Sequence, residues 1–275
     1  MNRTVIIHYH IFKNAGSTVD HILQNNFGRQ WLAFDGAQAS SRIPPEQLVS
    51  FLRDHPEARA VSSHNLTLPV PAMEGIDLAP ILFLRHPLDR VRSIYDFERR
   101  QGLLHGPVSR GAEHAAKLDF DGYVNWRFDM SRNGVIHNYH TAWLLHHPRY
   151  NRVAIRQGDY EAALGTLSAL PFFGLVEQFD ASLALLDGVL ASLGVSLSLD
   201  YRAQNTSQHH EKPLSKRIAT LQESICKTTW ARLEERNAWD LRLYEQARSL
   251  FEQRLAAPAP NAWTSARATT WGHRV

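Results

Sequence analysis

The sequence predicts an α/β fold in which a parallel sheet is flanked by helices, on two observations. Thr4 to Ile11 is a β-branched and aromatic run, and a short loop containing Gly16 leads from it into apolar positions at helical spacing. Pro80 to Leu84 is a continuous apolar run, typical of a strand buried on both faces of a parallel sheet, and a second helical stripe begins after Pro87. This repeated order of strand, loop and helix is that of βαβ units.

Other segments extend this pattern to a sheet of at least five strands. Short strands are expected at residues 31–34, 58–62, 153–156 and 172–176. The first helix is expected to end at Gly28, and another is expected to begin at Pro44. Further helices are expected over residues 138–145, 181–193 and 213–255. Residues 101–135 show little periodicity, which predicts an irregular excursion or a lid.

The length of 275 residues and a hydrophobic content of 44% suit one folded domain, expected over residues 1–255, with a flexible tail over residues 256–275. No apolar run approaches the ~20 residues that span a bilayer, so no membrane span is expected. The N-terminus lacks the features of a signal peptide, and Cys226 is the only cysteine. These features predict a cytoplasmic protein without an intrachain disulfide.

The charge balance favours a local anion site. The chain has 30 basic and 27 acidic side chains and a net charge of +3, without a run of basic residues or a nucleic-acid-binding motif. Nucleic acid is therefore not expected as a partner. The 15 histidines include no HExxH motif and have no cysteine cluster beside them, so no metal site is expected.

The loop after the first strand has the composition of a phosphate site. A helix that starts directly after a strand presents free backbone N–H groups and the positive end of its dipole. Lys13 adds a charge, and Ser17 and Thr18 add hydroxyl donors. This is not a Walker A loop, because Lys13 precedes Gly16 instead of following it. A tight turn in which Ser17 caps the helix is the alternative.

The strand that ends at Leu84 supplies a second candidate anion site. Arg85 leaves this buried strand, and Ser93 lies about 9 Å along the following helix from Pro87 at 1.5 Å per residue. Both side chains can share an anion at the carboxyl edge of the sheet. Arg85 could equally serve as a capping or salt-bridging residue.

Two segments resemble the sulfotransferases that use 3′-phosphoadenosine 5′-phosphosulfate (PAPS). The segment HIFKNAGST, from His10 to Thr18, resembles their 5′-phosphosulfate loop, which usually reads like IPKTGGTS. The segment LRHPLDRVRSIY, from Leu84 to Tyr95, resembles their 3′-phosphate segment, LRDPVERVLSxY. The chain is most similar to the branch with the heparan 2-O-sulfotransferases and their bacterial relatives. Further similar segments are residues 138–145, 205–207 and 237–244.

The resemblance implies a P-loop-like sulfotransferase fold and transfer of the sulfuryl group from PAPS to an acceptor hydroxyl. Lys13 would stabilise the leaving phosphate, and a histidine near its usual pKa is the natural base. His64 follows the third strand, where the family places its catalytic histidine, while His140 and Glu98 are reserve candidates. The residues implied to bind PAPS are Lys13, Asn14, Ala15, Gly16, Ser17, Thr18, Arg85, Ser93 and Ser207.

Two other functions remain open at this point. A P-loop kinase or nucleotide hydrolase would need a Mg²⁺ ligand, commonly an Asp at the end of a second buried strand, where this chain has Arg85. A binding module that keeps the nucleotide fold without turnover is the other alternative. The sequence leaves the acceptor open among carbohydrate, lipid, small molecule and tyrosine, and it leaves the oligomeric state open as well.

Overall fold

The computed structural model describes residues 3–38, 40–129, 134–145, 154–199 and 212–257. The chain divides into two compact units. Unit 1 comprises Met1–Leu84, Gly165–Asn205 and Ala247–Val275, and unit 2 comprises Arg85–Leu164 and Thr206–Gln246. Among the described residues, no helix is long and apolar enough to cross a membrane. One domain over residues 1–255 stays a prediction, and the predicted tail lies outside the described residues from 258 onward.

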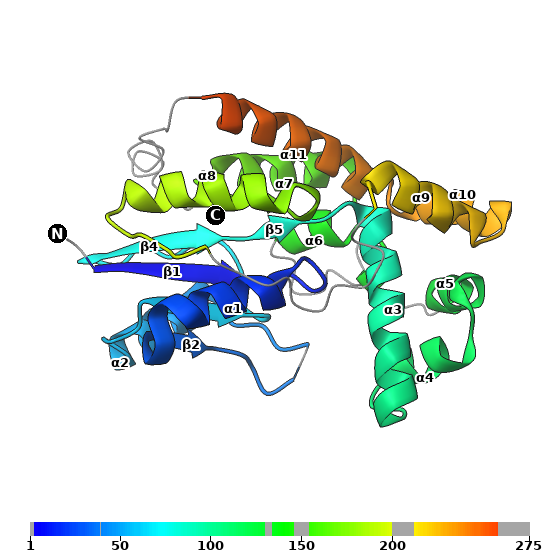
Figure 1. Ribbon diagram of the computed structural model, residues 1–275, viewed down its shortest axis with the longest axis horizontal. Coiled ribbons are helices and arrows are strands. Elements are labelled where there is room, and N and C mark those ends of the chain that lie inside the picture. Colours follow the sequence, from blue (N-terminus) through cyan, green and yellow to red (C-terminus); the bar gives the residue numbers. More distant parts are fainter. Residues whose placement is uncertain (1–2, 39, 130–133, 146–153, 200–211, 258–275) are drawn as a thin grey trace. The chain divides into compact units, whose positions relative to one another are not determined.

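Unit 1 is built on parallel strands, as predicted. A four-stranded sheet has the order β2-β3-β1-β4, and every neighbouring pair is parallel. Its strands are β1 (Arg3–Tyr9), β2 (Trp31–Ala33), β3 (Ala60–Ser63) and β4 (Ile76–Ile81). Figure 1 shows β1 and β4 side by side. Directly after β4, β5 (Phe83–Leu84) pairs in parallel with β6 (Gly174–Leu175), so the segment 76–84 connects the two sheets.

The sheet is buried because its strands are apolar on both faces. In β1, Val5, Ile6 and Ile7 point alternately to opposite faces and none is more than 1% exposed. Ile6 belongs to a core shared with α1 (Gly16–Phe27) and α8 (Phe179–Ala191). The predicted end of the first helix is confirmed, because Gly28 adopts a φ of 53° and its N–H is bonded to the carbonyl of Gln24.

The remaining helices near the sheet follow the predicted positions. Pro45 is at the start of α2 (Pro45–Asp54), where its missing N–H costs nothing. The carboxyl end of α7 (Gln157–Ala169) contacts α11 (Ala238–Ala256), since Arg254 donates to the carbonyl of Ser168. The short 3-10 helices of unit 1 are η1 (Gly28–Gln30) and η3 (Val176–Gln178).

Unit 2 is helical. Its longest element is α3 (Pro87–His105), and α4 (Arg110–Lys117) and α5 (Phe120–Asp129) lie beside it (Figure 1). The other elements are η2 (Gly134–Ile136), α6 (Tyr139–Leu144), α9 (Leu214–Glu223) and α10 (Lys227–Arg236). The predicted helices after Pro87, over residues 138–145 and over residues 213–255 are therefore confirmed in their main parts.

Two predicted elements were wrong. Residues 101–135 are not irregular, since α4, α5 and the end of α3 occupy much of this range. Their contacts depend on glycine, which leaves no hydrophobic signal: a Cβ on Gly102 would lie 2.2 Å from the carbonyl oxygen of Ala112. The strand expected at 153–156 is absent from its described part, residues 154–156.

Gly174 tests how closely the β5–β6 pair is packed. A Cβ at this position would lie 2.4 Å from the buried ring of Phe83, which other aromatic rings hold in place. We expect Gly174→Ala to lower the free energy of unfolding by about 1–3 kcal/mol, as overpacking does. Denaturant unfolding measures this. The control is Gly188→Ala in α8, where a Cβ meets nothing within 4 Å and stability should stay level or rise. Equal effects of the two changes would contradict the packing argument.

Candidate functional site

The loop between β1 and α1 makes a sharp turn. Lys13 and Ala15 adopt positive φ angles of 66° and 60°, which non-glycine residues adopt only at some cost. Asn14 anchors the turn, because its buried amide donates to the carbonyl of Phe83 at 2.7 Å and its backbone N–H donates to Ile11. Asn14, predicted to bind PAPS, therefore has a structural role in holding this loop.

The loop carries several hydrogen-bond donors at the start of α1, of which Ser17 is exposed and Gly16 is buried. Ala15 is the N-cap residue and makes no side-chain capping bond, so the alternative in which Ser17 caps the helix is wrong. Ser17 is exposed, Lys13 is half-buried, and the hydroxyl-bearing side chain of Thr18 is buried. In the part of the chain that the structure describes, no hydrogen bond uses the backbone N–H of Gly16 or Ser17. N–H groups, a hydroxyl and an ammonium of this kind are groups that can bind an anion.

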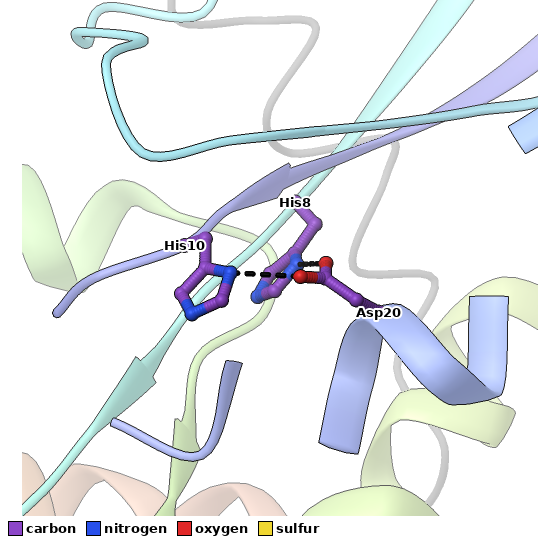
Figure 2. Close-up of side chains that lie close together, drawn as sticks. All are labelled: His8, His10 and Asp20. Carbon is purple, nitrogen blue, oxygen red and sulfur yellow. Dashed lines mark hydrogen bonds and ion pairs between the residues drawn. The ribbon is translucent and has the colours of Figure 1, made fainter. Parts of the chain in front are cut away.

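Behind this loop, two histidines share one carboxylate (Figure 2). His8 and His10 lie two residues apart at the end of β1, so their side chains leave the same side of the strand. Nδ1 of His8 lies 2.7 Å from one oxygen of Asp20 in α1, and Nδ1 of His10 lies 2.8 Å from the other. Because an ionised carboxylate only accepts hydrogen bonds, both Nδ1 atoms donate. In each ring, Nε2 is therefore the nitrogen at which a further proton can bind.

His10 connects the loop with His64. A Cβ on Gly16 would lie 2.0 Å from Cδ2 and 2.2 Å from Nε2 of His10, so this edge of the ring occupies the space that a side chain would fill. The rings of His10 and His64 lie 3.8 Å apart between centroids. The ring of His10 therefore lies between His64, the predicted base, and the start of α1.

The turn after β3 holds His64 in a defined orientation. Asp35 accepts the backbone N–H of His64 at 2.7 Å and the hydroxyl of Ser63 at 3.2 Å. Nδ1 of His64 lies 3.2 Å from the carbonyl of His10, which can only accept, so Nδ1 carries the hydrogen. Nε2 of neutral His64 then holds a lone pair, as a general base requires.

The protonation states follow from burial and from these bonds. Burial lowers the pKa of His10; the hydrogen bond to Asp20 opposes this and His8 reinforces it. Part of His64 is exposed, but the loss of hydration where it packs against the protein, together with the neighbouring His10, lowers its pKa as well. Burial raises the pKa of Asp20, but hydrogen bonds from His10 and His8 outweigh it, so this pKa lies well below its usual range. At neutral pH Asp20 is ionised, and His10 and His64 are neutral.

The same three groups are close enough to be considered as metal ligands. His8, His10 and Asp20 offer ligand atoms within 4.8 Å of one another. However, two ligands bound to one tetrahedral ion at ~2.0 Å are about 3.3 Å apart. The nitrogen–oxygen distances of 2.7 and 2.8 Å are those of charge-assisted hydrogen bonds. The geometry favours a hydrogen-bonded cluster.

Unit 2 contains a hollow that includes both Arg85 and Ser93. Asp89 organises it, because one of its oxygens accepts from Arg85 at 2.6 Å and from Arg217 of α9 at 2.7 Å. The salt-bridging alternative for Arg85 is thus correct, and it coexists with a place in the hollow. Its complete lining is Arg85, Asp89, Arg92, Ser93, Asp96, Arg217 and Leu221. Three arginines against two aspartates make this lining suited to an anion.

Other predicted residues lie elsewhere. Ser207 lies outside the described residues. His140 is 1% exposed, and burial, with Arg90 and His86, lowers its pKa well below the usual value. Glu98 is paired through both oxygens with Arg127 at 2.6 Å. Neither reserve base is placed to meet an acceptor.

Sequence reasoning missed Asp20, His10 and Arg217. The spacing of His8 and His10 was an available signal, because residues two apart on a strand share a face. Asp20 had no such signal because its contacts join a helix to the strand before it, and Arg217 had none because its partner Asp89 lies 128 positions away.

Asp89 should be important for stability. Asp89→Asn leaves two buried guanidinium groups with a weakened partner, so we expect the free energy of unfolding to fall by about 3 kcal/mol. The matched control is Asp96→Asn on the same helix, whose pair with Arg92 is about one quarter exposed and should contribute less than about 1 kcal/mol. Denaturant unfolding of both variants checks this. Equal losses of unfolding free energy in the two variants would show that the buried cluster stabilises the protein no more than the partly exposed pair.

The chain was compared with known proteins. No protein-family model matches it. An uncharacterized protein from Archaeoglobus fulgidus is 30% identical over 260 residues, which cover 92% of this chain and 99% of the archaeal protein. The similarity thus extends along nearly all of both chains and is not confined to one motif. This chain belongs to the same family as the archaeal protein.

Proposed function

We propose that the protein is a sulfotransferase that transfers the sulfuryl group of PAPS to an acceptor hydroxyl. The observation that carries the proposal lies within unit 1. A neutral histidine with a fixed tautomer, His64, is separated by one imidazole ring from a loop with free N–H groups and Lys13. An anion-binding loop beside a proton acceptor is what sulfuryl transfer to a hydroxyl needs.

Two sets of groups, one within each unit and each considered by itself, suit a phosphate. In unit 1, the N–H groups of Gly16 and Ser17 and the Lys13 ammonium suit the 5′-phosphosulfate. In unit 2, Arg85, Ser93 and Arg217 line a hollow whose arginines suit the 3′-phosphate. The assignment of the two phosphates follows the resemblance to PAPS sulfotransferases, and Arg217 is proposed beside Arg85 because it lines the same hollow.

The proposed step needs no reactant besides PAPS and the acceptor hydroxyl. The donor supplies the sulfuryl group: a bond forms between the acceptor oxygen and sulfur, and the bond from sulfur to the phosphate oxygen breaks. Nε2 of His64 takes the hydroxyl proton. Lys13 and the helix N–H groups stabilise the charge on the leaving phosphate. The products are a sulfate ester, 3′,5′-adenosine bisphosphate and one proton, which His64 later releases to water.

Nucleotide binding tests the donor before the acceptor is known. We expect wild-type protein to bind 3′,5′-adenosine bisphosphate with a micromolar dissociation constant and to ignore ATP with Mg²⁺, both measured by calorimetry. Arg85→Ala should weaken binding about 10- to 100-fold, the effect of losing a charge-assisted contact, while Asp89 keeps its pair with Arg217. The control is Arg100→Ala, an exposed position on α3. Preference for ATP would favour a P-loop kinase or nucleotide hydrolase. Binding of neither nucleotide would contradict a PAPS site.

His64 should control the rate without affecting nucleotide binding. We expect His64→Ala to lower turnover about 10²- to 10⁴-fold while the affinity for the bisphosphate is kept. In wild type the rate should rise with pH and level off, with a midpoint below 6.5, because burial lowers the pKa of His64 and the base must be unprotonated. His64→Ala should lose this acid limb. The readout is transfer of labelled sulfate to a panel of glycans, lipids, phenols and tyrosine peptides, and His21→Ala in α1 is the control. A His64→Ala enzyme that turns over at the wild-type rate would exclude this base.

A further inference from the structure

Asp20 is shared by two imidazoles in a way that constrains both (Figure 2). Each carboxylate oxygen accepts from a different histidine, His8 at 2.7 Å and His10 at 2.8 Å. The two rings lie 5.2 Å apart and nearly parallel, with 24° between their planes. With both Nδ1 atoms donating, Nε2 is the proton-accepting atom of each ring.

The His8 end of this cluster is fixed in the protein interior. His8 is 1% exposed, and its Nδ1 also lies 3.3 Å from the hydroxyl of Ser62 on the neighbouring strand β3. The Ser62 hydroxyl accepts from the indole N–H of Trp31 at 3.0 Å. His8 therefore locks Asp20 in place from the inside, and the other oxygen of Asp20 is directed at His10.

The His10 end lies at the proposed site. The Cδ2–Nε2 edge of His10 lies against Gly16, its ring packs on His64, and its carbonyl accepts from Nδ1 of His64. Any rotation or change of tautomer of His10 would therefore alter the support of His64.

We propose that Asp20 is a positioning residue for proton transfer, which holds His10 in one tautomer and orientation so that His10 can support His64 beside the start of α1. This rests on the proposed function, in which His64 is the base. Asp20 itself contacts neither donor nor acceptor and acts through His10. The arrangement corresponds to the way a buried carboxylate orients a catalytic imidazole through its Nδ1–H.

The charges around His10 determine how a change at Asp20 appears in the pH profile. The titratable groups that face His10 are His8 on β1, Asp20 on α1, Asp35 after β2 and His64 after β3. The negative charge of Asp20 favours the protonated forms of both His10 and His64. Removing it therefore lowers both pKa values, and the acid limb of the rate moves to lower pH.

Asp20→Asn is the central test, because it keeps the volume and removes the charge. The asparagine can accept from only one imidazole, and its NH₂ group forces the other to change tautomer. We expect kcat to fall about 10- to 100-fold, KM for PAPS to stay within about twofold, and the acid limb to shift to lower pH. Asp20→Glu, which restores the carboxylate, should recover part of kcat. Asp54→Asn at the exposed end of α2 is the control.

Two histidine variants separate positioning from folding. Asparagine retains an N–H close to the position of Nδ1, so His8→Asn should still hold Asp20 and keep most of kcat. His10→Asn also keeps that donor but loses the ring that supports His64, so its kcat should fall as in Asp20→Asn. Equal losses in the two histidine variants, or a wild-type kcat and pH profile in a folded Asp20→Asn, would overturn the proposal.

A readout independent of turnover distinguishes failure of this proposal from failure of the proposed function. Nitrogen-15 NMR of the imidazoles should show Nδ1–H tautomers for His8 and His10 in wild type and one changed tautomer in Asp20→Asn. Unchanged tautomers would overturn the role of Asp20, even in an active enzyme. If wild type binds no bisphosphate and transfers no sulfate, the proposed function fails, and the positioning proposal that rests on it fails too, whatever the tautomers show.

Discussion

The contact between the His10 ring and the backbone of Gly16 is the constraint on which the site in unit 1 depends. Only a residue without Cβ leaves room for an imidazole at the start of α1. The His10 ring therefore lies beside the hydrogen-bond donors of the loop, and the ring of His64 packs against it. The turn itself is made by Lys13 and Ala15, so Gly16 serves to admit the histidine ring.

A carboxylate organises the charged groups in each unit. In unit 1, Asp20 holds two imidazoles through its two oxygens. In unit 2, one oxygen of Asp89 holds Arg85 and Arg217, which come from segments far apart in the chain. Such buried clusters add little net stability compared with apolar packing, although breaking them costs several kcal/mol. Their effect is to keep polar groups in one orientation, as the proposed transfer reaction requires.

The parallel sheet accounts for where the groups of unit 1 gather. The strands β1 and β3 are adjacent and parallel, with His8 opposite Ser62 and Tyr9 opposite Ser63. The residues that follow each strand therefore emerge at the same edge, which brings His10 and His64 together although 54 positions separate them. The turn with positive φ angles at Lys13 and Ala15 then starts α1 at this edge, so that Asp20 contacts His8 of β1 and His10 directly after it.

The sequence by itself determined the strands around Val5 and Ala60, the helices after Gly16 and Pro87, and the parallel order, because hydrophobic periodicity and glycine or proline signals act over a few residues. It also indicated Lys13, Arg85, Ser93 and His64 as candidate binding or catalytic residues. Only the tertiary structure decided that Asn14 is an anchor, that residues 101–135 are largely helical, and that Asp20, His10 and Arg217 join these groups. Asn14 and Arg217 depend on contacts between segments far apart in the chain, and the other features depend on how neighbouring elements pack; no local pattern records either kind of contact.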